Sequence, residues 1–298
     1  MPTDEITAAA AGMWILGDRT VNRMGFGSMR ITANPDRELA ISVLRWAVEL
    51  GVNHIDTAAF YVSPGGTLQV GTGPVRYATE LIRVALAPYA DDLVVATKVG
   101  PGYDPSTGFY EATTPAQLRS QVEENLRRLG RDYLDVVNLR IVKRPGRDSI
   151  AERFGALARL RDAGLIRHLR LSNVRPDHLD EAQAIAPVVC VQNSYALDRH
   201  RTDDKFLRIC GERGVAFVPF FAIAGARREA GAITDHSEAV HAVALAHGAT
   251  PHQIRLAWTL HRGPHVLAIP GTGNSNHLMQ NIAAGAMKLS ADELASLG

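Results

Sequence analysis

The chain has 298 residues, of which 46% are hydrophobic and 21% charged, which is enough apolar material for a large core. Its 32 basic and 31 acidic side chains leave a net charge of +1, without the basic excess that nucleic-acid binding requires. No apolar run reaches the roughly 18 residues of a membrane helix. Two cysteines without a C-x-x-C spacing fit a reducing compartment. We therefore expect a cytoplasmic protein with no nucleic-acid or membrane partner.

Short β-branched runs alternate with longer amphipathic stretches along the whole chain. A hairpin is predicted around Gly17 and Asp18. The strands predicted after it lie at residues 24–28, 53–56, 93–98, 134–139, 166–172, 188–192, 215–219 and 266–269. The predicted helices lie at residues 37–50, 77–89, 115–129, 149–163, 176–184, 203–213, 237–247, 251–261 and 276–284. Glycine follows several of these helices, where its freedom to adopt a left-handed backbone ends a helix.

The strand count decides between two fold classes. Eight strands, each followed by a helix, predict a single (β/α)8 TIM barrel domain over residues 1–298 with an N-terminal β-hairpin. A doubly wound parallel sheet is the alternative. The segment 62–76 after the second strand is longer than most βα connections. It follows a carboxyl strand end, where barrels build their active sites, so it either shapes a substrate pocket or is a surface insertion.

Polar side chains stand where the predicted strands end. Burying such groups costs a few kcal/mol each unless they find partners, so their repetition at the ends of strands favours a binding or catalytic mouth. These residues are Asp56, Lys98, Asn138, Arg140, Ser172, Asn173, Gln192 and Asn193.

Asp56 and Lys98 on neighbouring strands could form an ion pair that only stabilises the barrel mouth. Tyr61, five residues after Asp56, favours a catalytic role instead. A tyrosine with an ordinary pKa of about 10 exchanges its proton poorly near neutrality. An ammonium beside it, held by a carboxylate, is expected to lower that pKa. The three residues together would form a proton donor for a carbonyl oxygen.

Five short motifs carry a resemblance to a known family. They are GVNHIDTA at 51–58, ATK at 96–98, LSNV at 171–174, VQN at 191–193 and IPGT at 269–272. With Tyr61, they resemble the aldo-keto reductases over nearly the whole chain. The resemblance implies reduction of an aldehyde or ketone by a nicotinamide cofactor, without a metal ion.

The resemblance also implies roles for individual residues. It makes Tyr61 the general acid and makes Lys98 and Asp56 the groups that tune its proton affinity. The residues implied for the nicotinamide are Ser172, Asn173 and Gln192 at its carboxamide and Phe220 against its ring, with core packing as the alternative for Phe220. The residues implied for the adenosine and its 2′-phosphate are Gly271, Thr272, His277, Gln280 and Asn281.

Two departures from the family pattern concern charge. Arg140 stands where the family usually has histidine, and the NLR at 138–140 resembles a bacterial branch that includes pyridoxal reductases. An arginine stays charged and offers up to five donors, so Arg140 could stabilise an alkoxide, hold an anionic group, or form a structural ion pair. His277 stands where many relatives have arginine, and Gly271 where some have lysine. NADP is therefore the expected cofactor, with NAD not excluded.

The predicted function is NADP-dependent reduction of a small carbonyl compound, such as pyridoxal or an intermediate of specialised metabolism. One alternative is a regulatory protein that binds the cofactor without turnover. Another is a Schiff-base aldolase using Lys98, against which Asp56 argues by keeping that amine protonated. Cys190 and Cys210 are expected to be buried thiols, and no H-E-x-x-H motif indicates a metal site.

Overall fold

The computed structural model describes residues 6–66, 68, 73–142, 146, 148–198, 203–223 and 235–298. At its centre is a curled sheet in the order β13-β12-β11-β10-β7-β4-β3, in which every neighbouring pair is parallel. These strands are β3 (Phe26–Gly27), β4 (His54–Asp56), β7 (Val94–Val99), β10 (Leu134–Arg140), β11 (Ile166–Ser172), β12 (Val188–Gln192) and β13 (Ala216–Phe217).

The predicted eighth strand closes this sheet into a barrel. Val266 forms a parallel bridge with Phe217 of β13, and Ala268 forms one with Met24, just before β3. The N–H of Ala268 donates to the carbonyl of Arg23 at 2.8 Å. The (β/α)8 prediction is therefore confirmed, with the eighth strand present as short bridges.

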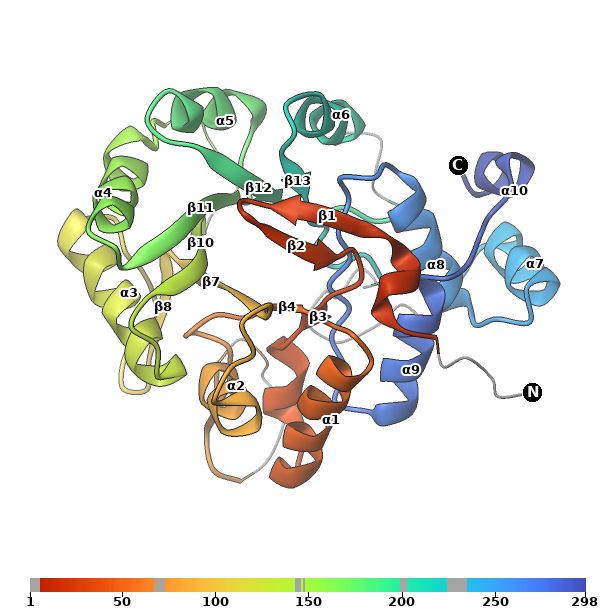
Figure 1. Cartoon of the computed structure of the whole chain (residues 1–298), viewed down its shortest axis with the longest axis horizontal. Helices are drawn as coiled ribbons and strands as arrows, with labels where there is room; N and C mark the ends of the chain where they lie inside the picture. The colour runs from red at the N-terminus through yellow and green to blue at the C-terminus, as the bar shows by residue number, and fades with distance from the viewer. Residues whose placement is uncertain are drawn as a thin grey trace.

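Helices surround the sheet on its outside (Figure 1). They are α1 (Arg37–Glu49), α2 (Ala78–Leu86), α3 (Pro115–Leu129), α4 (Ala151–Asp162), α5 (Pro176–Gln183), α6 (Asp204–Glu212), α7 (Glu238–Ala246), α8 (Pro251–His261), α9 (Ser275–Ala284) and α10 (Ala291–Leu297), with 3-10 helices at Ala8–Ala11 (η1) and Met29–Ala33 (η2). The ends of α3 show why they form where they do. Thr114 accepts from the N–H of Gln117 at 3.3 Å, and Gly130 ends the helix with a φ of 66°. Of the helices in the described ranges, α10 and the two 3-10 helices were not predicted.

The N-terminal hairpin lies across the amino end of the barrel (Figure 1). It consists of β1 (Met13–Leu16) and β2 (Arg19–Asn22), with the predicted turn at Gly17 and Asp18. Leu16 and Val21 are buried in an interior apolar cluster with Val94 and Val136. At the turn, Oδ1 of Asp18 lies 2.6 Å from Nε2 of His168 near the start of β11. The hairpin therefore seals the end of the barrel at which the strands begin.

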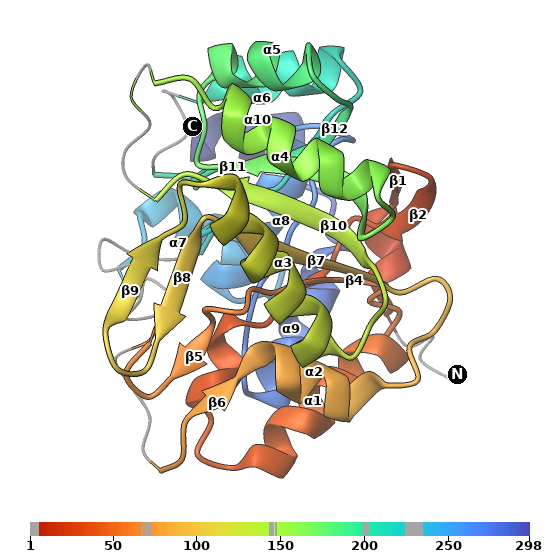
Figure 2. The same cartoon turned by 90° about the vertical axis from the view of Figure 1, so that its left-hand side faces the viewer.

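Two further hairpins, which the sequence did not predict, follow carboxyl strand ends (Figure 2). β5 (Val62–Ser63) pairs with β6 (Arg76–Tyr77), and β8 (Pro101–Asp104) pairs with β9 (Gly108–Glu111). A side chain at Gly65 would place its Cβ 3.3 Å from the hydroxyl of Tyr103, so the two hairpins adjoin. The ends of the long 62–76 segment are thus ordered by pairing, while its residues 67 and 69–72 lie outside the described residues.

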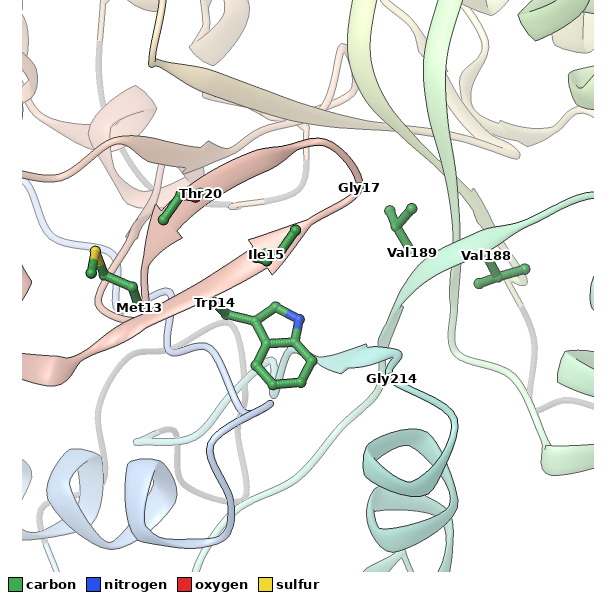
Figure 3. Close-up of a pocket in the computed structure, with 8 residues that line it drawn as sticks. All are labelled: Met13, Trp14, Ile15, Gly17, Thr20, Val188, Val189 and Gly214. Carbon is green, nitrogen blue, oxygen red and sulfur yellow. The ribbon is translucent and has the colours of Figure 1, made fainter.

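A hollow of about 700 Å³ lies at the amino end of the barrel, between the hairpin and the starts of β12 and β13. In the view of Figure 3 the Trp14 side chain lies between the hairpin and Gly214, with Ile15 and Val189 higher in the picture. Its lining residues carry no ionisable group. The hollow therefore lies at the opposite end from the polar strand ends at which a site was expected.

Within the described ranges, no helix has the length and apolar character needed to cross a membrane.

Candidate active site

Asp56 and Lys98 meet inside the carboxyl end of the barrel. Asp56 ends β4 and Lys98 lies near the end of β7, the neighbouring strand. The Lys98 ammonium donates to Oδ1 of Asp56 and, at 2.9 Å, to the carbonyl of Thr57. Both residues are only 2% exposed. The structure thus forms the ion pair that the sequence suggested.

Tyr61 lies against this pair, and its ring centroid is 4.7 Å from Nζ of Lys98. Burial raises the pKa of Tyr61 above its usual value, and the charge of Asp56 adds to the rise, whereas Arg140 and Arg170 oppose it. The expected lowering of this pKa is therefore wrong. Sequence reasoning counted the nearby ammonium but not the loss of water around the phenol.

Arg170 on β11 is the second cation bound to Asp56, and sequence reasoning missed it. Its guanidinium donates to Oδ2 of Asp56, and both side chains are nearly excluded from solvent. A signal for it was present, because Arg170 stands two residues before Ser172. Side chains two apart on a strand share a face, so a polar Ser172 in the mouth places Arg170 inside the barrel.

Burial and charge act against each other in this group. Burial pushes the pKa of Asp56 upward, but Lys98 and Arg170 outweigh it and hold that pKa below its usual range. Burial lowers the pKa of Lys98 to about 7, with Asp56 opposing the fall and Arg170 adding to it. Two cations thus share one carboxylate in an interior that excludes solvent.

Gln192 at the end of β12 is held by this interior network. Its Nε2 donates to Oδ2 of Asp56 at 3.0 Å. Its Oε1 accepts from Nδ2 of Asn138 at 3.1 Å and from Nη2 of Arg170 at 3.4 Å. An amide oxygen has two acceptor sites and the amide nitrogen two protons. Gln192 therefore keeps one N–H with which to bind a ligand.

Ser172 and Phe220 both contact Arg140. Nη1 of Arg140 donates to Oγ of Ser172 at 3.1 Å, and its guanidinium carbon lies 4.9 Å from the centroid of the Phe220 ring. Phe220 is partly exposed and lies outside the apolar core clusters. Phe220 is therefore not part of the core clusters that the structure describes. In the described part of the chain Arg140 makes a hydrogen bond and a cation–π contact, and no ion pair with an acidic side chain.

Asn173 follows Ser172 in a left-handed conformation with a φ of 57°. Its N–H donates to the carbonyl of Gln192 at 3.0 Å, and its Nδ2 donates to the carbonyl of Ile141 at 2.8 Å. Asparagine tolerates this backbone better than most residues. The three residues predicted at a nicotinamide carboxamide are thus brought together at the carboxyl ends of the neighbouring strands β11 and β12.

The predicted adenosine residues lie where the eighth strand passes into α9. The side chain of Asn274 caps this helix by accepting from the N–H of His277 at 3.1 Å. His277 and Gln280 are exposed one turn apart, whereas Thr272 and Asn281 are each 7% exposed. An exposed helix N-terminus suits a phosphate.

Gly271, also predicted at the adenosine end, is explained by packing of the backbone. A Cβ there would lie 2.3 Å from the carbonyl oxygen of Gly27 on β3. Glycine is therefore required at this position whether or not a ligand is bound.

Among the described residues, no group of three or more His, Cys, Asp or Glu side chains is arranged to hold a metal ion. Cys190 and Cys210 are both buried, as predicted. Burial raises the thiol pKa of Cys190 to about 11 and that of Cys210 to about 12. Neither thiol is therefore reactive near neutrality.

Comparison with known proteins now identifies the family. The model of the aldo/keto reductase family matches residues 23–298. The chain belongs to the aldo-keto reductases. A pyridoxine 4-dehydrogenase of Escherichia coli is 41% identical over 300 residues, covering 97% of this chain and 98% of that protein. An uncharacterized oxidoreductase of Schizosaccharomyces pombe is 36% identical, covering 98% of this chain and 90% of that protein.

Solved structures of other family members share the fold. A thermostable aldo-keto reductase in complex with the inhibitor epalrestat is 30% identical, with a TM-score of 0.75 over 96% of this chain and 98% of that one. An aldo-keto reductase of Klebsiella pneumoniae in complex with NADPH is 28% identical, with a TM-score of 0.76 over 93% of this chain and 90% of that one.

Proposed function

We propose that this protein, acting as one barrel domain, reduces an aldehyde or ketone to an alcohol with NADPH, using Tyr61 as the general acid. The observation that carries the proposal is the contact of Tyr61 with the buried Lys98–Asp56 pair, 4.7 Å from ring centroid to ammonium. Arg140 beside Ser172 and Phe220 supplies a fixed cation at the same mouth.

The residues present fit a nicotinamide cofactor. Gln192 retains one N–H for a carboxamide, next to Ser172 and Asn173 at the same strand edge. Phe220 offers a partly exposed aromatic face for the ring, and the N-terminus of α9 suits the 2′-phosphate. The NADPH complex of the Klebsiella pneumoniae relative supports the choice of NADP over NAD.

Tyr61, Lys98 and Arg140 have separate roles in the proposed reduction. Bound NADPH would supply a hydride to the carbonyl carbon. The raised pKa of Tyr61 keeps its hydroxyl protonated at neutral pH, ready to donate to the carbonyl oxygen as that oxygen gains charge. Lys98 stabilises the phenolate that forms, and Arg140 stabilises the developing alkoxide.

Pyridoxal is the proposed substrate, because the Escherichia coli relative that is 41% identical over nearly the full length is a pyridoxine 4-dehydrogenase. The test is to follow loss of NADPH absorbance with the purified protein and pyridoxal, and to repeat it with NADH. We expect steady turnover with NADPH and slower turnover with NADH. Tight NADPH binding without turnover of pyridoxal or of a panel of aldehydes would instead support a regulatory role.

A Schiff-base aldolase remains the second candidate, because burial lowers the pKa of Lys98 to about 7 and weakens the expectation that Asp56 keeps it protonated. Against this reading, the same nitrogen already donates to Asp56 and Thr57. Borohydride treatment with substrate and without nicotinamide discriminates the two. A stable adduct on Lys98 would favour the aldolase, and we expect none.

A further inference from the structure

Asp56 is shared by two cations that approach it from different strands. Lys98 of β7 donates to its Oδ1, and Arg170 of β11 donates to its Oδ2. The side chains of the two cations are 1% and 2% exposed, and that of Asp56 is 3% exposed. One buried carboxylate therefore faces two buried positive charges.

The charges of this group do not cancel. An arginine side chain is a cation, so the single positive charge of Arg170 already equals the single negative charge of Asp56. A protonated Lys98 then adds a surplus positive charge, with Arg140 as a further cation near the site. Among the described residues, no other neighbouring side chain removes the surplus. His54, on the same strand as Asp56, has its pKa lowered to about 4 by burial and by Arg170, so it is neutral. Cys190, beside Arg170, is a neutral thiol.

We propose that Arg170 is a positioning residue that occupies Asp56 so that the charge of Lys98 stays uncompensated until Tyr61 gives up its proton. The inference rests on the proposed role of Tyr61 as general acid. Before the reaction, the surplus positive charge of Lys98 lies beside the neutral phenol of Tyr61. As the proton leaves Tyr61, the negative charge of the phenolate forms beside Lys98 and compensates the surplus positive charge. A charge that is unpaired before the reaction and paired during it stabilises the transition state selectively.

The same guanidinium also connects the acid to the expected cofactor residue. Nη2 of Arg170 lies 3.4 Å from Oε1 of Gln192, which also accepts from Asn138. Because two donors face Oε1, the amide nitrogen of Gln192 is the end left to face a ligand. Asn138 alone can keep that orientation, so replacing Arg170 should change the charge of the site more than its shape.

A direct test measures the protonation of Lys98 without any turnover. The sequence contains only four lysines, so the ¹³Cε signals of labelled lysine can be titrated one by one, with Lys98→Met identifying its peak. We compare the wild type with Arg170→Met, which removes the cation but keeps an unbranched apolar stem. In Arg170→Met the Lys98 midpoint should rise by about one pH unit or more, because a like charge has left its surroundings.

Arg170→Lys is the matched control, because it retains a cation facing Asp56. Its Lys98 midpoint should stay near that of the wild type. Equal midpoints in the wild type and Arg170→Met would overturn the proposal, as would equal rises in Arg170→Met and Arg170→Lys. If Arg170→Met does not fold, a raised midpoint in Arg170→Lys would likewise overturn it.

Kinetics provide the second readout. Reduction requires the cationic form of Lys98, so wild-type kcat should fall as pH rises through about 7. In Arg170→Met the falling limb should move to higher pH and the plateau kcat should drop about tenfold, with little change in the Kd for NADPH. A purely structural role would alter stability without moving the limb. If the wild type reduces no carbonyl compound, the proposed function fails, while the lysine titration still decides the role of Arg170.

Discussion

The two ends of the barrel interior are filled by different kinds of side chain. At the amino end, Leu16 and Val21 of the hairpin fill the barrel together with Val94 and Val136, and the nearby hollow is lined without an ionisable group (Figure 3). At the carboxyl end, the interior holds a connected group of charged and amide side chains. Its members are Asp56, Lys98, Asn138, Arg170 and Gln192.

The difference separates stability from chemistry within one barrel. Apolar packing at the amino end gains free energy from burial alone. The polar group gains little net stability, because desolvation offsets its attractions. It also leaves Nε of Arg170 and Oδ1 of Asn138 without partners among the described residues. Buried charges held at such a cost are typical of a functional site. Substitutions at the carboxyl end should therefore change kcat, whereas substitutions at the amino end should not.

The largest effect is expected from Tyr61→Phe at the carboxyl end. Loss of the hydroxyl removes the proton donor, so kcat should fall by about 10²- to 10⁴-fold. The Kd for NADPH and the unfolding midpoint should stay close to those of the wild type, since the ring and its contact with Lys98 remain. Tyr133→Phe, at an exposed tyrosine outside the site, is the control. Full activity in Tyr61→Phe would show that another group is the acid.

At the carboxyl end, the sequence predicted the residues at the ends of the barrel strands but missed one that lies deeper in the barrel. The strand ends identified Asp56, Lys98, Arg140, Ser172 and Gln192, because the last residue of a barrel strand faces the mouth. Arg170 lies two residues deeper and was missed, although its spacing from Ser172 placed it on the same face. The direction of the Tyr61 pKa was also wrong, because desolvation depends on packing that no local pattern reveals.

The fold was more predictable than the site, because its signals are repeated. Each strand pairs in parallel with the next, and helix ends carry capping residues such as Thr114 and Gly130. The β8–β9 hairpin was missed because its strands pair only with each other, and Phe109 and Tyr110 are exposed. β9 has no buried residue, and a strand without a buried face shows no clear alternation of apolar and polar residues.

A large loss of stability is expected from Asp56→Asn. The change leaves Lys98 and Arg170 buried without their carboxylate, which should cost about 3–5 kcal/mol of unfolding free energy. The loss should be smaller at pH 8 than at pH 6, because Lys98 can shed its proton at the higher pH. Urea unfolding at both pH values measures it, with the exposed Asp91→Asn as control. A loss independent of pH would mean that Lys98 carries no titratable charge.

At the amino end, a substitution should lower stability without changing activity. Leu16 is 1% exposed within the interior cluster, so Leu16→Ala should lower the unfolding free energy by about 2–5 kcal/mol while kcat stays unchanged. Ile15→Ala, on the neighbouring and 67% exposed side chain of the same strand, should cost little. Thermal unfolding and steady-state kinetics on the same samples make the comparison. A fall in kcat for Leu16→Ala at a temperature where it is fully folded would contradict the separation of the two ends.

The smallest effect is expected at the turn of the hairpin. The hydrogen bond from His168, with Arg167, lowers the pKa of Asp18 to about 2. A carboxylate whose pKa is lowered by folding stabilises the protein above its unfolded value near 4, and that contribution disappears as pH falls from about 4 to about 2. Because Asp18 is 50% exposed, solvent screens these pairs, so Asp18→Asn should cost only about 0.2–1 kcal/mol. The difference from wild type should shrink in high salt and vanish below about pH 2, as urea unfolding over a pH series can measure. A difference that persists at low pH would mean that Asp18 does not stabilise the hairpin through its charge.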